Sequence, residues 1–317
     1  MTGLIADIGG TNARLALIGD DGVLGPSADV ACDAHEGVEE LLRAFLDGMA
    51  GGVRPDRVAL AVASPVTGDQ IYLTNRDWGF SVAALRHRLG FSRLEVVNDF
   101  AAVALALPYL ESGDMHPVGE GRADPTAPMV AIGPGTGLGL SVLVPGPGSR
   151  PVVLATEGGH STLPAGSDRE AEAIAVLRRE FGHVSVERVV SGPGLTNLHR
   201  ALGRLDGRAD EADLNPAAIT ARAADGSCPL CREAVDIFCA LLGEVAGNAA
   251  LMVGARGGVF IAGGIVPRLG EVFPRSDFRA RFEAKGRMSD YVKGIPTAVI
   301  VHGHPAFLGL AGLVRPE

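Results

Sequence analysis

The sequence predicts an α/β chain built from two similar halves. In each half, short runs rich in Val, Ile and Leu come first, and longer segments with apolar residues at helical spacing then alternate with further runs of this kind. A length of 317 residues also fits about two domains. Glycine and proline gather between residues 108 and 128, which places the boundary near 105–125.

The first half is expected to contain four strands and two helices. The strands are Leu4–Ile8, Arg14–Ile18, Val58–Ala63 and Leu94–Val97, and the first two form a hairpin pair. Apolar residues at positions 38, 41, 42, 45 and 49 share one face of a helix, and a weaker helix covers residues 81–89.

The second half repeats this order. Its expected strands are Met129–Ile132, Leu140–Val144, Val152–Ala155, Val259–Ala262 and Ala298–Val301. A capping-box spacing at Ser167–Glu170 begins one helix, and further helices are expected over residues 185–203 and 230–253. The apolar segment 305–313 predicts a last helix that packs back on the first half. We therefore expect a smaller lobe of residues 1–107 plus about 303–317, and a larger lobe of residues 108–302.

Composition excludes several classes of protein. Lys and Arg number 28 against 37 Asp and Glu, so the formal net charge of −9 argues against nucleic-acid binding. With 47% hydrophobic and 21% charged residues, the chain can form a sizeable core. Neither a signal peptide nor an uninterrupted apolar run of about 18 residues is visible, so we expect a cytoplasmic protein that does not enter a membrane.

The four cysteines do not suggest a disulfide framework. Cys228 and Cys231 have the spacing of a metal or redox pair, but no second pair of ligands accompanies them in the sequence. Because a structural zinc site normally uses four ligands, we interpret this pair as structural. Six histidines without a partner pattern, His199 among them, are interpreted as surface or structural residues.

Two glycine-rich loops join neighbouring strands. In the first, Gly9 and Gly10 let a hairpin turn expose backbone N–H groups to an anion, and Thr11 and Asn12 add side-chain donors. Asp7, between Ala6 and Ile8 at the end of a buried strand, is placed to meet a hydrated metal cation. The second loop, Gly133–Gly139, repeats this design with Gly135, Thr136 and Gly137. A tight hairpin that needs glycine for its geometry alone is the alternative for either loop.

Neither loop is a Walker P-loop or a dinucleotide fingerprint, because no Gly-Lys-Ser/Thr occurs and a strand, not a helix, follows the second loop. Two phosphate-type hairpins from similar halves suggest a nucleotide held in a cleft between them, with Mg²⁺ and backbone dipoles neutralising its charge. A third element, Gly257–Val266, ends its strand at Gly263 and Gly264, where a flat adenine ring can approach the backbone. A strand with a packing glycine pair explains that element equally well.

The chain resembles a known family through motifs that occur in one order. DIGGTNAR, GPGTGLG and GGVFIAGGIV are similar to the phosphate and adenosine motifs of the sugar kinase, Hsp70 and actin superfamily. DIGGTNARLAL, ASPVTGD, LTNRDW, VNDFAAVA, EGGH and ERVVSGPGL resemble the bacterial glucokinase family with the hexokinase-type fold, from residue 4 to about 312. The resemblance implies two lobes of the actin-like ATPase (ribonuclease H-like) type, with nucleotide and sugar between them. It also implies ATP, Mg²⁺, glucose and a homodimer.

The same resemblance assigns the sugar site. Asp99 follows a buried strand and matches the family's catalytic base, while Asn98 matches a ligand of sugar hydroxyls. Glu157, His160 and Glu187 match hydroxyl-binding residues, and Asn75 lies in a loop expected to cover the sugar. From the residues alone, Asn98 or Asp99 can equally cap a helix, and Glu187 can be a solvated carboxylate in a first helical turn. Trp78, the single tryptophan, is expected in the core.

These observations predict an ATP-dependent phosphotransferase for the 6-hydroxyl of glucose. A kinase for another hexose and a sugar-binding regulator on the same fold remain alternatives, and the phosphoryl donor could be polyphosphate in place of ATP. The regulator is disfavoured by the acidic charge and because the first loop begins at residue 7, which leaves no room for a DNA-binding module before it.

Overall fold

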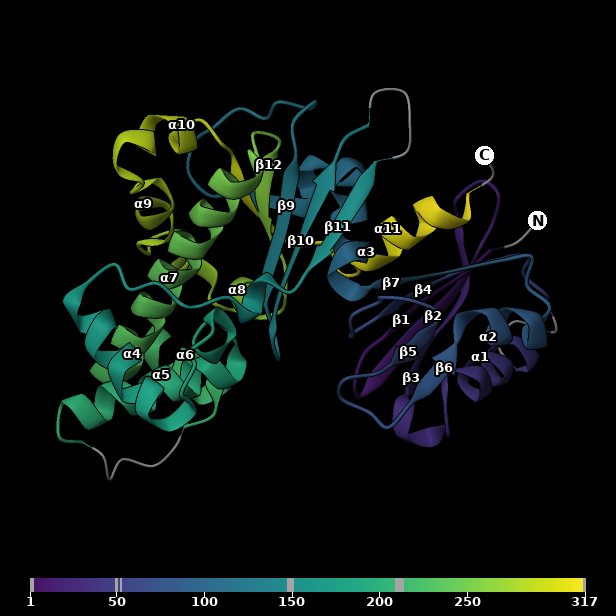
Figure 1. Ribbon diagram of the computed structural model, residues 1–317, viewed down its shortest axis with the longest axis horizontal. Helices are drawn as coiled ribbons and strands as arrows, with labels where there is room; N and C mark the ends of the chain where they lie inside the picture. Colours follow the sequence, from purple (N-terminus) through teal and green to yellow (C-terminus); the bar gives the residue numbers. More distant parts are fainter. Residues whose placement is uncertain (1–2, 49–50, 52, 147–150, 209–213, 316–317) are drawn as a thin grey trace. The chain divides into compact units, whose positions relative to one another are not determined.

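The computed structural model describes residues 3–48, 51, 53–146, 151–208 and 214–315. The chain divides into two compact units, which Figure 1 shows as ribbons. Unit 1 consists of Met1–Leu110 and His302–Glu317, and unit 2 consists of Glu111–Val301. Each unit has its own cluster of buried apolar side chains.

Unit 1 is organised around a five-stranded sheet in the order β3-β2-β1-β4-β7. Its strands are β1 (Gly3–Ile8), β2 (Asn12–Ile18), β3 (Leu24–Ala31), β4 (Arg57–Val62) and β7 (Arg93–Asn98). β1, β4 and β7 run parallel, whereas β2 and β3 are each antiparallel to the strand before them. β1 and β4 are buried along nearly their whole length, which explains their continuous apolar sequence. A separate hairpin pairs β5 (Gln70–Tyr72) with β6 (Gly79–Ser81).

Among its described residues, unit 1 also contains the α-helices α1 (Val38–Asp47), α2 (Val82–Leu89), α3 (Asp99–Ala106) and α11 (Pro305–Val314). α1 buries the apolar face that its sequence predicts, and α2 ends at Gly90 in the left-handed conformation. α11 packs on α3, β1 and β4. The two helices approach closely at Gly309, where a Cβ atom would collide with the carbonyl oxygen of Ala102.

Unit 2 contains a six-stranded sheet in the order β11-β10-β9-β12-β13-β8. Its strands are β8 (Met115–Pro117), β9 (Met129–Pro134), β10 (Leu138–Val144), β11 (Val152–Thr156), β12 (Gly258–Ile261) and β13 (Thr297–Ile300). From β11 to β13, the order and directions of the strands are those of the sheet in unit 1. The prediction of an α/β chain with two similarly built halves is therefore confirmed.

The helices of unit 2 are α4 (Asp168–Phe181), α5 (Gly192–Leu205), α6 (Pro216–Ala224), α7 (Pro229–Val253), α8 (Ile265–Arg268), α9 (Phe278–Glu283) and α10 (Ser289–Lys293). α7 lies at their centre and contacts α5, α6, α9 and the strands β9 and β12 (Figure 1). A Cβ atom at Gly243 or Gly247 would collide with the backbone of Phe278 or Phe282. These glycines therefore let α9 pack directly against α7.

α7 is also long and apolar enough to cross a membrane by length and composition alone. Of its most apolar window, 67% is buried inside the protein. The core helix of a folded domain passes the same test, so the apolar character of α7 is explained by its packing.

Three local expectations differ from the structure. The helix expected from residue 185 begins at Gly192, because the Ser191 hydroxyl accepts a hydrogen bond from the N–H of Gly194 and caps that end. The strand β3 was not expected. At α4, Ser167 accepts from the N–H of Glu170, but the carboxylate of Glu170 accepts from the N–H of Gly166 and pairs with Arg281, so the capping box is not reciprocal.

Candidate functional site

Three parallel strands of unit 1 end at the same edge of their sheet. Ile8 in β1 pairs with Val62 in β4, and Val62 pairs with Asn98 in β7. The segments that follow these strands carry the first glycine loop, Ser64 and Asp99. Because ligands of open α/β sheets bind beyond the carboxyl ends of the strands, this edge is where unit 1 offers a site.

The first glycine loop is a tight turn between β1 and β2. The N–H of Gly9 donates to the carbonyl of Asn12 over 3.0 Å, and the carbonyl of Thr11 accepts from the N–H of Cys32 over 2.8 Å. A Cβ atom at Gly10 would lie 3.2 Å from the Cβ atom of Asn75. The loop thus lies directly beside the segment that carries Asn75.

Two carboxylates near this loop, Asp7 and Asp99, interact electrostatically. The pKa of Asp7 is raised from 3.8 to about 6, chiefly because the side chain is buried and also because the Asp99 carboxylate repels its charge. Arg14, which pairs with Asp7 across β1 and β2, acts in the opposite direction. A divalent cation at Asp7 would relieve both unfavourable contributions.

Asn98 is the N-cap of α3. Its Oδ1 accepts hydrogen bonds from the N–H groups of Phe100 (2.9 Å) and Ala101 (3.3 Å). Asp99 is the first residue of the helix, and its Oδ1 also accepts from the N–H of Phe100 over 2.8 Å. The capping alternative is therefore correct for Asn98, and it fixes both side chains at the edge of the sheet.

A buried serine connects the remaining residues of this cluster. Nδ2 of Asn98 donates to the carbonyl of Ser64 over 3.4 Å, and Oγ of Ser64 accepts from the N–H of Thr74 over 2.7 Å. Asn75 follows Thr74 and lies against Gly10. Unit 1 therefore brings together all of the residues that the sequence assigned to it: the segment from Ala6 to Asn12, with Asn75, Asn98 and Asp99.

The second glycine loop is held by residues far away in the sequence. The N–H of Gly135 donates to the carbonyl of Gly137 over 2.8 Å, and the carbonyl of Gly135 accepts from the N–H of Gly192, the first residue of α5, over the same distance. Oε2 of Glu187 accepts from the N–H of Leu138 over 2.9 Å. A Cβ atom at Gly137 would collide with that carboxylate, so the observed position of the Glu187 side chain depends on glycine there.

The expected hydroxyl ligands of unit 2 lie in two neighbouring turns beside the strand that follows this loop. Glu157 and His160 stand at the ends of a short 3-10 turn, and their side chains are 57% and 61% exposed, with 3.9 Å between Oε2 and Nε2. Between them, Gly159 packs on the carbonyl of Leu138. The neighbouring turn carries Glu187, which is half-buried and bound to the loop, not solvated.

The third glycine element lies beside the second loop. β9 and β12 are in register, with Ile132 opposite Ile261, and the N–H of Ala262 donates to the carbonyl of Ile132 over 2.8 Å. Gly263 has φ +84° and lies so close to the carbonyl of Pro134 that a Cβ atom would collide with it. The backbone at Gly263 and Gly264 therefore reaches the end of the strand that leads into the loop.

Trp78 is 8% exposed and belongs to the core of unit 1, as predicted, with the Arg76 guanidinium 4.8 Å from its ring centroid. Sequence reasoning missed Arg14, which forms an ion pair with Asp29 (2.6 Å) and contacts Nδ1 of His304 (3.0 Å). Burial and the nearby Arg14 charge lower the pKa of His304. The hairpin register was the available signal, since it sets Arg14 opposite Asp7.

Comparisons of the sequence with known proteins indicate one family. The family model described as Glucokinase matches residues 4–316. The chain is 51% identical to a glucokinase of Paramagnetospirillum magneticum over 98% of this chain and 97% of that protein, and 50% identical to one of Aromatoleum aromaticum over 97% and 93%. It superposes on the crystal structure of a glucokinase from an Antarctic psychrotroph with a TM-score of 0.89 and 38% identity, covering 98% of each chain. A glucokinase of the ROK family from Streptomyces griseus, solved with glucose and AMPPNP, is 18% identical with a TM-score of 0.64, covers 99% of each chain and shares the fold.

Proposed function

The chain belongs to the glucokinase family, and we propose that it transfers the γ-phosphoryl group of ATP to the 6-hydroxyl of glucose, giving glucose 6-phosphate and ADP. The family match over nearly the whole chain carries this conclusion. It agrees with the chemistry of the residues at the sheet edges, where carboxylates, an amide and two glycine loops are available.

We assign proton transfer to Asp99. A phosphoryl acceptor must lose its hydroxyl proton as the new bond forms, and a carboxylate fixed at a strand end can accept it. Asp99 is held by the N–H of Phe100, so its orientation is set before substrate binds. The reaction then requires a sugar hydroxyl within hydrogen-bond distance of this carboxylate and in line with the γ-phosphoryl group.

We assign recognition of the sugar hydroxyls to Asn75, Asn98, Glu157, His160 and Glu187. Oδ1 of Asn98 already accepts hydrogen bonds from α3, so its amide group serves the sugar as a donor. Glu187 binds Leu138 through Oε2 and retains Oε1 as an acceptor for a hydroxyl. Its carboxylate would thereby join the sugar to the second glycine loop.

We assign the nucleotide to the segment Ala6–Asn12, to Gly135, Thr136 and Gly137, and to Gly263 and Gly264. Mg²⁺ fits Asp7, because this carboxylate is partly desolvated and is repelled by the charge of Asp99. Such an oxygen is a suitable partner for a hard cation, directly or through water. When bound, the ion would neutralise charge on the phosphates. Asp7 must be ionised for this role, and a pKa of about 6 leaves most molecules ionised above pH 7.

The proposal includes a homodimer and a cytoplasmic location. Both are inferred from membership of the family.

The reaction is tested by ADP release from Mg-ATP with glucose, mannose, fructose, N-acetylglucosamine or no sugar, and with polyphosphate as the alternative donor. Strong dependence on glucose and ATP is expected. Release with another sugar would change the substrate and keep the mechanism. No sugar-dependent release from folded protein would refute the kinase assignment.

The base is tested by Asp99→Asn, which keeps an oxygen for the N–H of Phe100 and removes the proton acceptor. Turnover should fall by roughly 10²–10⁴ while glucose binding is retained. Asp290→Asn, at an exposed carboxylate on α10, is the matched control and should leave turnover unchanged. Near-normal turnover of Asp99→Asn would show that another group accepts the proton.

A further inference from the structure

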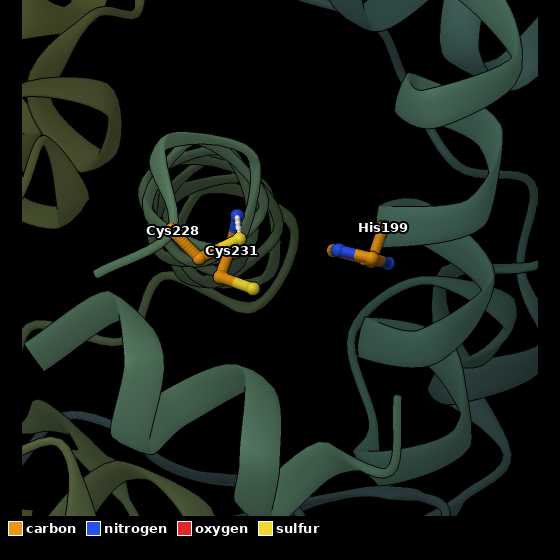
Figure 2. Close-up of side chains that lie close together, drawn as sticks. All are labelled: His199, Cys228 and Cys231. Carbon is orange, nitrogen blue, oxygen red and sulfur yellow. Dashed lines mark hydrogen bonds between the residues drawn. The ribbon is translucent and has the colours of Figure 1, made fainter. Parts of the chain in front are cut away.

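One imidazole and two thiols meet in unit 2, away from the glycine loops. His199 lies on α5 and points toward the first turn of α7, which carries Cys228 and Cys231, as Figure 2 shows. One ligand atom from each of the three residues lies within 4.8 Å of the others. The cysteine pair, interpreted above as structural, therefore gains a third potential ligand that is 29 positions away in the sequence.

The separation of the ligand atoms is close to that of a metal site. Bond lengths of about 2.3 Å to sulfur and 2.0 Å to nitrogen place tetrahedral ligand atoms roughly 3.3–3.8 Å apart. The observed limit of 4.8 Å between ligand atoms is about 1 Å longer than these distances. Because His199 and Cys231 are buried, most of the coordination shell would be supplied by the protein.

Cys228 presents its sulfur at the start of α7. Cys228 is the N-cap of α7, and its Sγ accepts a hydrogen bond from the N–H of Cys231 over 3.1 Å. The positive end of the helix dipole stabilises negative charge at this position. Cys228 is half-buried, so solvent can supply a further ligand on its side of the cluster.

We propose that His199, Cys228 and Cys231 bind one Zn²⁺ ion, with water as the fourth ligand. Two thiolates and an imidazole form a borderline-soft donor set of the kind that Zn²⁺ prefers over Mg²⁺. Binding releases the two thiol protons to solvent, so affinity falls as pH is lowered. Both cysteines are reduced in the structure, as ligation requires.

The ion would stabilise the helical part of unit 2. It would connect α5 to α7, which already pack on each other. α5 begins at Gly192, whose N–H donates to the carbonyl of Gly135 in the second glycine loop. The site does not depend on the proposed function, because its three ligands take no part in the assigned binding or catalysis.

The test is metal binding by the whole protein, reduced and kept anaerobic. After equilibration with Zn²⁺ and dialysis, about one equivalent should be retained, and Co²⁺ in its place should give thiolate charge-transfer and strong d–d absorption typical of a tetrahedral site. A hundredfold excess of Zn²⁺ over its Kd should raise the apparent unfolding midpoint by roughly 5–10 °C.

Cys228→Ser is the decisive variant, because serine keeps a cap for α7 at a position that is not in the core. It should lose the retained zinc, the cobalt spectrum and the thermal shift. Cys239→Ala is the matched control: Cys239 lies on the same helix, and burial raises the pKa of its thiol to about 12, so its loss should leave metal binding unchanged. Equal binding by wild type and Cys228→Ser would overturn the proposal, as would wild-type protein that retains no metal or isolates only as a Cys228–Cys231 disulfide.

Discussion

Replacing Asp7 by Asn should stabilise unit 1 and at the same time impair turnover. The pKa of Asp7 rises from 3.8 in an ordinary environment to about 6 in the fold, so the folded state binds this proton more tightly than the unfolded chain does. The stabilising contribution of that proton is fully present below about pH 4 and is lost as pH rises through 6. A rise of about 2 in this pKa on folding corresponds to about 3 kcal/mol in the free energy of unfolding.

The neutral Asn side chain carries no charge to bury, so Asp7→Asn should gain stability relative to wild type as pH rises. The free energy of unfolding of Asp7→Asn minus that of wild type should be constant below pH 4 and increase between pH 4 and 6. Above pH 7 this difference should level off at about 3 kcal/mol more than its value below pH 4. The free energy of unfolding of small proteins falls by about 1–3 kcal/mol per M of urea, so a difference of about 3 kcal/mol moves the unfolding midpoint by roughly 1–3 M.

Trp78 makes the assay specific. It is the single tryptophan of the chain and is buried in unit 1, so its fluorescence reports the unit that contains Asp7. Urea titrations would be made without nucleotide or metal, at several pH values. Asp47→Asn, at a surface carboxylate of the same unit, should change the free energy of unfolding at pH 7.5 by under about 0.5 kcal/mol. A difference between Asp7→Asn and wild type that does not vary from pH 4 to 7.5 would refute the assignment of a buried, ionised carboxylate.

Two further substitutions separate structural from functional roles. Asn98→Ala removes the cap of α3 and should lower the free energy of unfolding by about 1 kcal/mol. Asn98→Ser should restore stability but not glucose affinity, because serine can cap the helix but lacks the amide donor. Equal KM values for wild type and Asn98→Ser would exclude a role for that donor. Gly137→Ala would displace the Glu187 carboxylate and leave the N–H of Leu138 without its acceptor. A hydrogen bond to a charged group contributes roughly 1.5–3 kcal/mol, so its loss should lower kcat/KM at least tenfold. Unchanged kinetics in Gly137→Ala would show that the loop tolerates a different carboxylate position.

Buried strands and glycine loops were predictable because their signals are local. β1 and β4 are continuous apolar runs, and each glycine loop lies between two such runs. β3 was missed because it is an edge strand: it is mostly exposed and contains Gly25 and Pro26, residues that an edge tolerates and a central strand does not. The start of α5 was misplaced since Val186, Val189 and Val190 are buried at near-helical spacing in the turn before it.

Contacts between residues that are distant in the sequence could not be predicted from it. Glu187 binds the N–H of Leu138, which is 49 positions away, and nothing near either residue signals this bond. The same holds for His199, whose neighbours Cys228 and Cys231 become visible only when α5 packs on α7. Strand periodicity fixes which residues end at one sheet edge, but side-chain partners between helices depend on the packing of the whole unit.

The return of α11 to unit 1 has a consequence for synthesis on the ribosome. Unit 2 is a continuous stretch of chain, from Glu111 to Val301, so all of its residues are translated before the last helix begins. Unit 1, although its sheet is translated first, lacks the helix that covers α3 until residues 305–314 emerge. The first half of the chain to be made is therefore the last to be finished, and a nascent chain stalled before residue 305 would expose the Ala-rich face of α3 on which Gly309 otherwise packs.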